Sequence, residues 1–349
     1  MRRVALIGYG LGGRSFHAPL IAVTSGLRLD AIVTSDPERR RQASADHPTA
    51  RLLESADDVF ARPNDFDLAV VTTPNRTHVP LARRALDAGL PVVVDKPIAP
   101  TAAEARELCE LARRRNLLLT VYHNRRFDGD FRTIGRLVRE GELGSVHRFE
   151  SRFERWRPEP RGGWREKADP AEAGGLLFDL GSHLIDQALQ LFGPVADVYA
   201  ELDARRPGVQ VDDDVFVALT HQSGVRSHLW MSVLAADRAP RFRIFGSKGT
   251  YTNFGMDVQD EALRAGQRPD AVDWGEEPRD AWGVIANGKD TSPVPTDRGA
   301  YQDFYAAVAS SLATGAPPPV DPLDAVAVVE VIEAANATAV RATREAGTD

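Results

Sequence analysis

The feature that most constrains the fold of this chain is a regular alternation of short β-branched runs with helical patterns over its first 122 residues. The runs rich in Val, Ile and Leu predict strands at residues 3–10, 27–35, 66–74, 90–97 and 117–124, and the segments between them predict helices at 14–25, 37–46, 77–89 and 101–116. Strands that alternate with helices form a parallel sheet with helices on both faces. Ligands of such sheets bind at the carboxyl ends of the strands, so we expect a site there.

A glycine-rich loop follows the first of these strands. Gly8, Gly10 and Gly13 form the pattern G-x-G-x-x-G, with Leu11 inside it, and a predicted helix starts directly afterwards. The first glycine permits a tight turn, the second lets the backbone approach a pyrophosphate, and the third lets the helix pack close to the strand. A loop of this kind can also exist without a ligand. Here strand, loop and helix occur in the required order, and we therefore predict a dinucleotide site that includes Leu11.

The end of the second strand bears on which dinucleotide is bound. NAD enzymes place an acidic residue there, about 20 residues past the glycines, to bind the ribose 2′-hydroxyl. In this chain Thr34 and Ser35 end the strand and Asp36 follows one residue late, with Arg39 after it. Two hydroxyls and an arginine suit a 2′-phosphate. Alternatively, Asp36 caps the next helix with Pro37 at its first position, which also removes Asp36 from the ribose. The pattern favours NADP over NAD.

The third predicted strand ends in a group of residues that should face the same cofactor. These residues are Thr72, Pro74, Asn75 and His78. Because the carboxyl ends of parallel strands share one edge of the sheet, we expect them near the ribose and nicotinamide. The alternative is a simple turn, in which Pro-Asn is ordinary turn chemistry and Thr77 caps the following helix.

Lys96 is unusual because the chain has 43 basic residues and only four of them are lysines. It follows a run of three valines and Asp95, at the end of the fourth predicted strand. An ammonium at this edge can hold a substrate oxygen and stabilise negative charge on it. Lysine also loses a proton more readily than arginine, so the two are not interchangeable. The alternative is a solvated lysine that pairs with Asp95.

Asp179 and His183 lie four residues apart in a predicted amphipathic helix after Gly174 and Gly175. Residues with this spacing stack on one helix face. A carboxylate that accepts from one imidazole nitrogen leaves the other nitrogen as a general base. Two structural interpretations compete: positions 179, 183, 186 and 190 can form an ordinary solvated stripe, and Asp179 can be an N-cap. On spacing alone the structural interpretations are favoured.

The remainder of the chain has the pattern of a second domain. A helix is followed by strands typical of an antiparallel sheet, including two over residues 213–235 that join at Ser223 and Gly224. The polar stretch 255–297 predicts surface loops. We therefore predict a dinucleotide-binding domain at residues 1–122 and a substrate-binding α+β domain at residues 123–349.

Charge and apolar patterning exclude several classes of partner. A net charge of −7 argues against nucleic acid as a main partner. No apolar run approaches the ~18 residues that a membrane span requires, and the N-terminal run of four apolar residues is too short for a signal peptide. The single cysteine, Cys109, excludes an internal disulfide. We expect a cytoplasmic protein with a small-molecule substrate.

Five segments together resemble the Gfo/Idh/MocA oxidoreductase family over essentially the whole chain. They are GYGLGGRSFHAPLI, VVTTPNRTH, DKPIA, HNRRFDGDF and GGLLFDLGSHLIDQ, in this order. The first of them, the NRRFDGDF segment and WRPEPRGGWRE are most similar to the branch that contains NADP-dependent scyllo-inositol dehydrogenases. Many members have Glu before the lysine, where this chain has Asp95.

The resemblance implies a fold and a set of site residues. The fold is α/β, with an N-terminal Rossmann doubly wound parallel sheet and a C-terminal α+β domain. The second domain has a large, mostly antiparallel open sheet, covered by helices on one face and used for dimer contact on the other. The resemblance further implies catalytic Lys96, Asp179 and His183, which also contact substrate; cofactor contacts from Asp95, Lys96, Trp164 and Arg165; and substrate contacts from Asn124 and Arg125.

The resemblance and the residues together predict hydride transfer between NADP, or less favourably NAD, and a secondary alcohol of a sugar or inositol-like polyol. Two alternatives keep the dinucleotide site: glycoside hydrolysis or elimination with no net redox change, and a sensor without catalytic activity. No metal site is predicted. We expect a homodimer or a dimer of dimers.

Overall fold

The computed structural model describes residues 1–160, 162–163, 166 and 169–341. The chain divides into two compact units. The first contains residues 1–132, 257–277 and 297–327, and the second contains residues 133–256, 278–296 and the residues from 328 onward. Each unit is built around its own sheet.

The first unit has a six-stranded parallel sheet in the order β3-β2-β1-β4-β5-β6. Its strands are β1 (Arg2–Ile7), β2 (Leu27–Val33), β3 (Arg51–Leu53), β4 (Leu68–Val71), β5 (Val92–Val94) and β6 (Leu119–Val121). The chain winds outward on one side of β1 and then returns to the other side, so the order reverses between β1 and β4. This is the doubly wound arrangement, and it confirms the predicted Rossmann fold. Strand β3 was not predicted.

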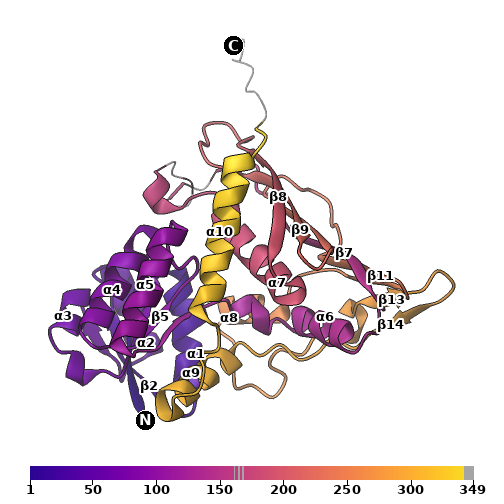
Figure 1. Cartoon of the computed structure of the whole chain (residues 1–349). Helices are drawn as coiled ribbons and strands as arrows, with labels where there is room; N and C mark the ends of the chain where they lie inside the picture. The colour runs from indigo at the N-terminus through magenta and orange to yellow at the C-terminus, as the bar shows by residue number, and fades with distance from the viewer. Residues whose placement is uncertain (161, 164–165, 167–168, 342–349) are drawn as a thin grey trace. The chain divides into compact units, whose positions relative to one another are not determined.

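Helices flank the parallel sheet of the first unit (Figure 1). They are η1 (Gly12–His17), α1 (Ala18–Val23), α2 (Pro37–Asp46), α3 (Ala56–Phe60), α4 (His78–Asp87), α5 (Ala102–Arg115) and α9 (Gln302–Thr314). Helix α9 comes from far along the chain and lies next to α1 (Figure 1).

The position of α9 corrects the predicted division of the chain. Residues 257–277 and 297–327 belong to the first unit, although the sequence patterns assigned them to a continuous second domain. The physical reason is aromatic packing, because Tyr301, Phe304 and Tyr305 are fully buried in the core of the parallel sheet. Burial of three such side chains is a strong non-local driving force.

The second unit contains an eight-stranded sheet in the order β14-β13-β12-β11-β7-β10-β9-β8. Its strands are β7 (Val146–Glu154), β8 (Val195–Asp203), β9 (Asp214–His221), β10 (Arg226–Ser232), β11 (Phe242–Gly246), β12 (Thr250–Asn253), β13 (Val284–Ala286) and β14 (Thr291–Pro293). All neighbours are antiparallel except β7 and β10. This arrangement confirms the predicted large, mostly antiparallel sheet.

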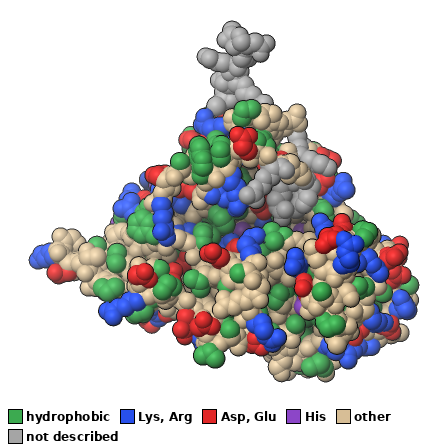
Figure 2. All heavy atoms as spheres, turned by 180° about the vertical axis from the view of Figure 1, so that it is seen from behind, with side chains coloured by type: hydrophobic (Ala, Val, Ile, Leu, Met, Phe, Trp, Pro, Cys, Tyr) green, Lys and Arg blue, Asp and Glu red, His purple; other side chains and the backbone are tan. Residues whose placement is uncertain are grey.

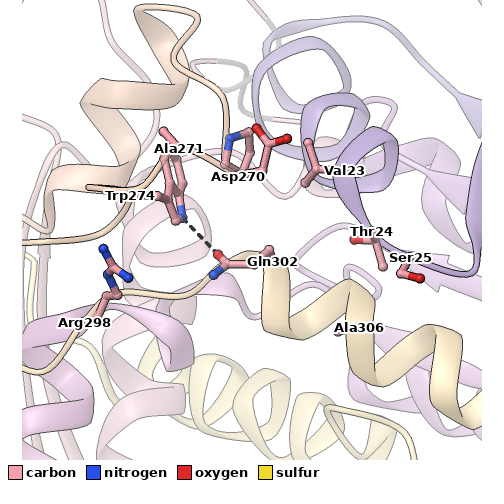
Figure 3. Close-up of a pocket in the computed structure, with 10 residues that line it drawn as sticks. Val23, Thr24, Ser25, Asp270, Ala271, Trp274, Arg298, Gln302 and Ala306 are labelled. Carbon is pink, nitrogen blue, oxygen red and sulfur yellow. Dashed lines mark hydrogen bonds between the residues drawn. The ribbon is translucent and has the colours of Figure 1, made fainter.

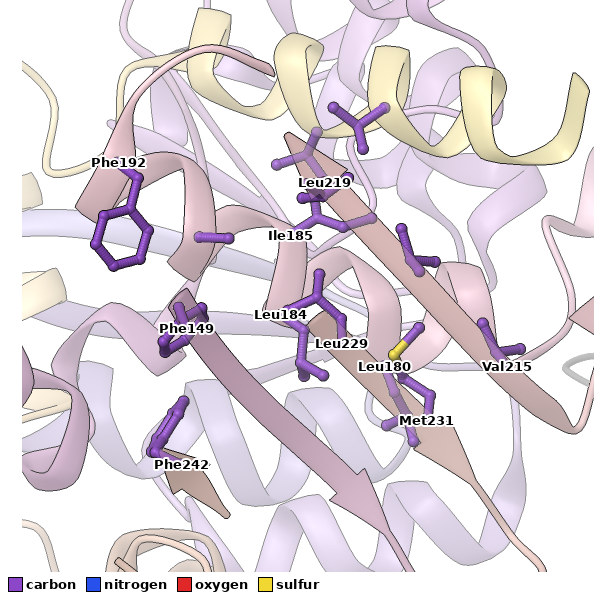
Figure 4. Packing of buried hydrophobic residues seen from close by; sticks show 14 of the residues in the cluster. Phe149, Leu180, Leu184, Ile185, Phe192, Val215, Leu219, Leu229, Met231 and Phe242 are labelled. Carbon is purple, nitrogen blue, oxygen red and sulfur yellow. The ribbon is translucent and has the colours of Figure 1, made fainter. Parts of the chain in front are cut away.

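Helix α7 (Ser182–Phe192) packs on one face of this sheet, near β7 and β10. Figure 4 shows Leu180 and Leu184 pointing toward Leu229 and Met231 of β10. Helices α6 (Gly129–Arg139) and α10 (Pro322–Thr338) add further apolar side chains to this core. Along β9 the residues alternate between buried and partly exposed, so only one face of the sheet belongs to the core.

The stretch 255–297 contains more regular structure than the predicted surface loops. It includes helix α8 (Val258–Arg264), the 3-10 turn η8 (Arg279–Ala281) and strands β13 and β14. Helix α8 is held by polar groups: Asp257 accepts from the N–H of Gln259 at 2.8 Å and from the N–H of Gly129 at 2.6 Å. Polar contacts of this kind leave no apolar period in a sequence, which is why the pattern did not reveal the helix.

On the face shown in Figure 2, basic and acidic side chains are interspersed. Within the described part of the chain, no helix is both long and apolar enough to cross a bilayer.

Candidate active site

The glycine loop of the first unit can exist only with glycine at two of its positions. Gly8 has φ +108°, and a Cβ there would lie 2.6 Å from the carbonyl oxygen of Thr72. A Cβ on Gly13 would overlap the carbonyl oxygen of Gly8, so the start of η1 sits directly on the end of β1. A Cβ on Gly10 would have no neighbour closer than Nη1 of Arg39, at 3.9 Å. Leu11 is exposed. The loop thus offers open backbone at a helix N-terminus, which is the arrangement that binds a pyrophosphate.

The end of β2 has the arrangement expected if Asp36 is a helix cap. One carboxylate oxygen of Asp36 accepts from the backbone N–H of Arg39 at 2.9 Å, and Pro37 is the first residue of α2. Ser35 is exposed and Thr34 is buried. The Arg39 guanidinium lies at the glycine loop, since its Nη1 is the atom nearest the Cβ position of Gly10. The position at which NAD enzymes carry a ribose-binding carboxylate is therefore occupied by a hydroxyl with an arginine nearby.

The ends of β4 and β5 meet the glycine loop. Thr72 Oγ1 lies 3.4 Å from Asp95 Oδ2. A Cβ on Gly12 would be 2.7 Å from Thr72 Oγ1 and 3.0 Å from Asp95 Oδ2. The structure thus brings together three predicted parts of the site: the glycine motif, the end of β4 and the residue before Lys96.

His78 ties the loop after β4 to the loop after β5. It is buried, and its two ring nitrogens lie 2.8 Å from the carbonyl oxygens of Thr73 and Pro97. Asn75, in the same loop, is also buried. The alternative in which Thr77 caps the following helix is wrong, because its hydroxyl donates to the carbonyl oxygen of Pro74 at 2.6 Å. The contacts of His78 favour a role in shaping the loops beside Lys96.

Asp95 is held as a carboxylate beside Lys96. Oδ1 of Asp95 accepts from the backbone N–H of Lys96 at 2.8 Å, and Oδ2 lies 3.6 Å from Nε2 of His17. Burial alone would raise the pKa of Asp95, but the neighbouring His17, followed by Lys96 and His78, lowers that pKa to about 2. Lys96 itself is partly exposed. His17 was missed as a site residue because a histidine on an apolar helix face usually belongs to the core.

Arg125 is buried in an ion-pair network of the first unit. Its Nη1 donates to Asp128 at 3.3 Å and its Nη2 donates to Asp260 at 2.9 Å. Tyr301 donates to the other oxygen of Asp128 at 2.6 Å. These contacts attach α8 and α9 to the turn that contains Arg125, which favours a structural role over the predicted substrate contact. Asn124, next to it, is also buried.

In the second unit, Asp179 and His183 lie where a π-helical turn runs into α7. The turn is η7 (Leu177–Gly181). Neither structural alternative fits this segment. Only 7% of His183 and 2% of Asp186 is exposed, so they do not form a solvated stripe. Asp179 is inside the turn, whose N-cap position is Leu176. Isolated π-turns occur frequently at functional sites.

Asp212, which was not predicted, supplies the cap of this turn. Its Oδ2 accepts from the N–H of Leu177 at 2.7 Å, and its carbonyl oxygen accepts from the N–H of Leu176 at 3.0 Å. A Cβ on Gly175 (φ +90°) would overlap the same carboxylate. Burial raises the pKa of Asp212 to about 6, although hydrogen bonds from the Leu177 and Leu176 backbone oppose the shift. The pair Gly174-Gly175 was the only local sign that something packs against this turn.

Trp164 and Arg165, the remaining predicted cofactor contacts, lie outside the described residues. Among the residues that are described, no group of three or more His, Cys, Asp or Glu side chains is arranged to hold a metal ion.

A cavity of about 430 Å³ in the first unit is lined by none of these residues. Figure 3 shows its lining. Its lining includes Thr24, Ser25, Trp274 and Gln302, and Trp274 Nε1 donates to Gln302 Oε1 at 2.9 Å. Thr24 and Ser25 precede β2 and therefore mark the amino edge of the sheet, whereas the glycine loop is at the carboxyl edge. The cavity is not part of the predicted dinucleotide site.

Comparisons with known proteins cover both units. A family model described as an oxidoreductase family with an NAD-binding Rossmann fold (GFO_IDH_MocA) matches residues 2–123. A model of the GFO/IDH/MocA C-terminal domain matches residues 131–252. The chain is 42% identical to the uncharacterized oxidoreductase YdgJ of Escherichia coli, over 89% of this chain and 88% of that protein.

Two further relatives are similar over most of their length. The scyllo-inositol 2-dehydrogenase (NADP(+)) IolW of Bacillus subtilis is 34% identical, over 91% of this chain and 88% of that protein. The solved structure of the YPO2259 oxidoreductase from Yersinia pestis superposes with a TM-score of 0.89 at 41% identity, covering 97% of this chain and 94% of that one.

Proposed function

Because this chain belongs to the Gfo/Idh/MocA family of NAD(P)-binding oxidoreductases, we propose that it transfers a hydride between NADP and a secondary alcohol of a sugar or cyclic polyol. One observation carries this proposal. If Gly12 had a Cβ, that atom would lie 3.0 Å from Oδ2 of Asp95, so the residue before Lys96 is in contact with the glycine loop. A lysine next to that contact is suited to bind the oxygen of the carbon that exchanges the hydride.

The residues of the chain have separate roles in this reaction. A bound nicotinamide would supply the hydride acceptor. The glycine loop fits such a cofactor because its backbone is open at Gly10, and Thr72 and Asp95 lie against the same loop at Gly12. In the oxidative direction His183 takes the hydroxyl proton, and Asp179 orients the imidazole. Lys96 binds the same oxygen and stabilises the charge that develops on it.

A substrate screen tests this function. Sugars and polyols, including inositol isomers, are incubated with the enzyme and either NADP or NAD, and reduction is followed by absorbance at 340 nm. We expect at least one secondary alcohol to reduce NADP. Release of product without any absorbance change would instead support hydrolysis or elimination through a transiently reduced cofactor. Cofactor binding with no turnover of any compound would support a sensor.

NADP is the cofactor that we propose, because Asp36 caps α2 and Arg39 lies at the glycine loop. Ser35→Asp is expected to reverse the preference, since a carboxylate repels a 2′-phosphate and accepts from a ribose 2′-hydroxyl. Arg39→Ala is expected to weaken NADPH binding by about tenfold or more, the range for one charge-assisted hydrogen bond, and to leave NADH binding nearly unchanged. Both are measured by fluorescence titration with NADPH and NADH.

Arg41→Ala is the matched control for cofactor preference, because Arg41 is exposed on the same helix and pairs with Glu38. It should bind both nucleotides as the wild type does. Equal or tighter binding of NADH by the wild type, with no effect of Ser35→Asp, would refute the NADP assignment.

A homodimer, or a dimer of dimers, is the assembly that we propose, with the open face of the eight-stranded sheet in contact with a second copy. Aromatic side chains line this face: Phe216 and Trp230 have ring centroids 5.1 Å apart, and Tyr199, beside Phe216, is 44% exposed. The Arg152 guanidinium lies 3.8 Å from the Trp230 ring centre. Aromatic residues and arginine are enriched in protein interfaces.

Trp230→Glu is expected to convert the assembly to monomers in analytical ultracentrifugation, because it removes an aromatic anchor of the packed interface and puts a charged group in its place. Val272→Glu is the control, since Val272 is 93% exposed and belongs to the first unit. It should sediment as the wild type does. A wild-type protein that sediments as a monomer at all concentrations would contradict the assignment.

A further inference from the structure

His17 occupies a buried position beside Asp95, the residue before Lys96, and the proposed reaction gives it no role. It ends η1, the helical turn that begins at the glycine loop, and it is fully buried. Its ring is tilted against Tyr122 with 4.2 Å between centroids. Its Nδ1 lies 2.6 Å from the hydroxyl of Tyr305, and its Nε2 lies 3.6 Å from Oδ2 of Asp95. Residues from η1, from the loop after β5 and from α9 thus meet at one imidazole.

The protons of this cluster can be assigned from its chemistry. The carboxylate of Asp95 is ionised, since its pKa is lowered to about 2, and it can only accept. Nε2 of His17 must then carry a proton in order to face it favourably. In the neutral imidazole this leaves Nδ1 as an acceptor, so the Tyr305 hydroxyl donates to it. Burial raises the pKa of Tyr305 well above its usual value, which keeps that hydroxyl protonated.

The chain of contacts continues to Lys96. The second oxygen of Asp95 accepts from the backbone N–H of Lys96 at 2.8 Å. Thr72 lies 3.4 Å from the oxygen that faces His17. Each oxygen of the carboxylate thus has its own contact, and the backbone of Lys96 is attached to the carboxylate that His17 orients.

We propose that His17 and Tyr305 are positioning residues for the reaction: together they orient the Asp95 carboxylate, and through it they hold Lys96 in the geometry that the hydride transfer requires. Neither residue touches substrate. The inference rests on the proposed function of Lys96. Its first consequence, the effect of His17 on the pKa of the Asp95 carboxyl, can be measured without any substrate.

A dependence on pH separates this role from ordinary core packing. The groups that face Asp95 are His17 from η1, His78 from α4, Tyr122 after β6, Tyr305 from α9 and the adjacent Lys96. Of these, His17 lowers the pKa of Asp95 most. Without the imidazole, only Lys96 and His78 oppose the effect of burial, so the pKa of Asp95 rises. Asp95 would then become protonated as the pH falls through a higher value, and activity would be lost there.

Four variants test the proposal. His17→Leu removes the donor and Tyr305→Phe removes only the hydroxyl that fixes the tautomer. His17→Gln retains an N–H that can reach the place of Nε2. Tyr122→Phe is the matched control, because it keeps the ring that packs on His17 and loses only a hydroxyl, which donates to the carbonyl oxygen of Phe16 at 2.9 Å and takes no part in the contacts from Tyr305 to Lys96. Each is assayed for kcat and KM from pH 5 to 9, and the Asp95 carboxyl is titrated by ¹³C NMR, with Asp95→Asn used for assignment.

We expect His17→Leu to lower kcat about tenfold or more with a much smaller change in KM, to move the acid limb of kcat to higher pH, and to raise the measured pKa of Asp95. Tyr305→Phe should shift the acid limb of kcat and the pKa of Asp95 in the same direction, but by less. His17→Gln should restore most of kcat, and Tyr122→Phe should match the wild type. Loss of kcat equally at every pH, or an unchanged Asp95 titration in His17→Leu, would overturn the inference. The NMR titration needs no turnover, so a wild type without dehydrogenase activity would refute the proposed function alone.

Discussion

Lys96→Arg is expected to be nearly as inactive as Lys96→Met, with a loss of about 10²-fold or more in turnover, the range for losing one donor to a developing oxyanion. The guanidinium is wider than an ammonium, it cannot give up a proton, and its extra atoms crowd the oxygen that Lys96 is proposed to bind. Both variants should still bind NADP, because the glycine loop and Arg39 are unchanged. The measurement is steady-state kcat on the alcohol that the screen identifies, together with fluorescence titration of NADPH.

Lys248→Arg is the matched control for this experiment. Lys248 Nζ donates to the carbonyl oxygen of Gly141 at 3.1 Å in the second unit, and a guanidinium can make the same contact. Its turnover should equal that of the wild type. Activity within about threefold of the wild type for Lys96→Arg would show that any fixed positive charge suffices, and the specific role of Lys96 would have to be withdrawn.

His183→Ala is expected to lower turnover by about 10²-fold or more, which is the usual effect of losing a general acid or base. Cofactor affinity should hardly change, because no predicted dinucleotide contact involves α7. The measurement is kcat across pH. The wild-type profile should include a limb for the group that takes the proton, and that limb should be absent from the residual activity of the variant.

His221→Gln separates the loss of a base from the loss of a buried histidine. His221 is also buried in the second unit, and its ring nitrogens lie 2.8 Å from the carbonyl oxygen of Gly193 and 2.8 Å from the hydroxyl of Ser227. Its replacement should reduce the free energy of unfolding without changing kcat. If His183→Ala behaved in the same way, the histidine would be a structural residue of α7.

Much of the first unit was predictable because its signals are local. Short apolar runs, helical patterns and one glycine motif are enough to predict a doubly wound sheet, since each strand needs only its own residues to be recognised. The cap of α2 was also local: Asp36 precedes Pro37 and accepts from an N–H three residues later. For the same reason Thr72, Asp95 and the glycines could be assigned to one edge of the sheet before their contacts were known.

The contacts that shape the candidate site were not predictable, because they join residues far apart in the chain. Tyr305 reaches His17 across 288 positions, and Asp212 caps a turn that begins 35 residues before it. Such contacts are made by single polar atoms, which leave no period in the sequence. The division of the chain is non-local as well, because Tyr301 and its aromatic neighbours return to the first core from far along the sequence.

The sequence by itself determined the class of fold and the position of the dinucleotide loop, because strand ends and glycine turns are properties of neighbouring residues. Lys96, Asp179 and His183 became catalytic candidates through the family resemblance of the segments that contain them. Only the tertiary structure decided that Asp95 stays charged, that His183 lies on a buried face and that Arg125 is engaged by Asp128 and Asp260. Charge and burial depend on which distant groups surround a side chain, and those groups are chosen by the packing of the whole unit.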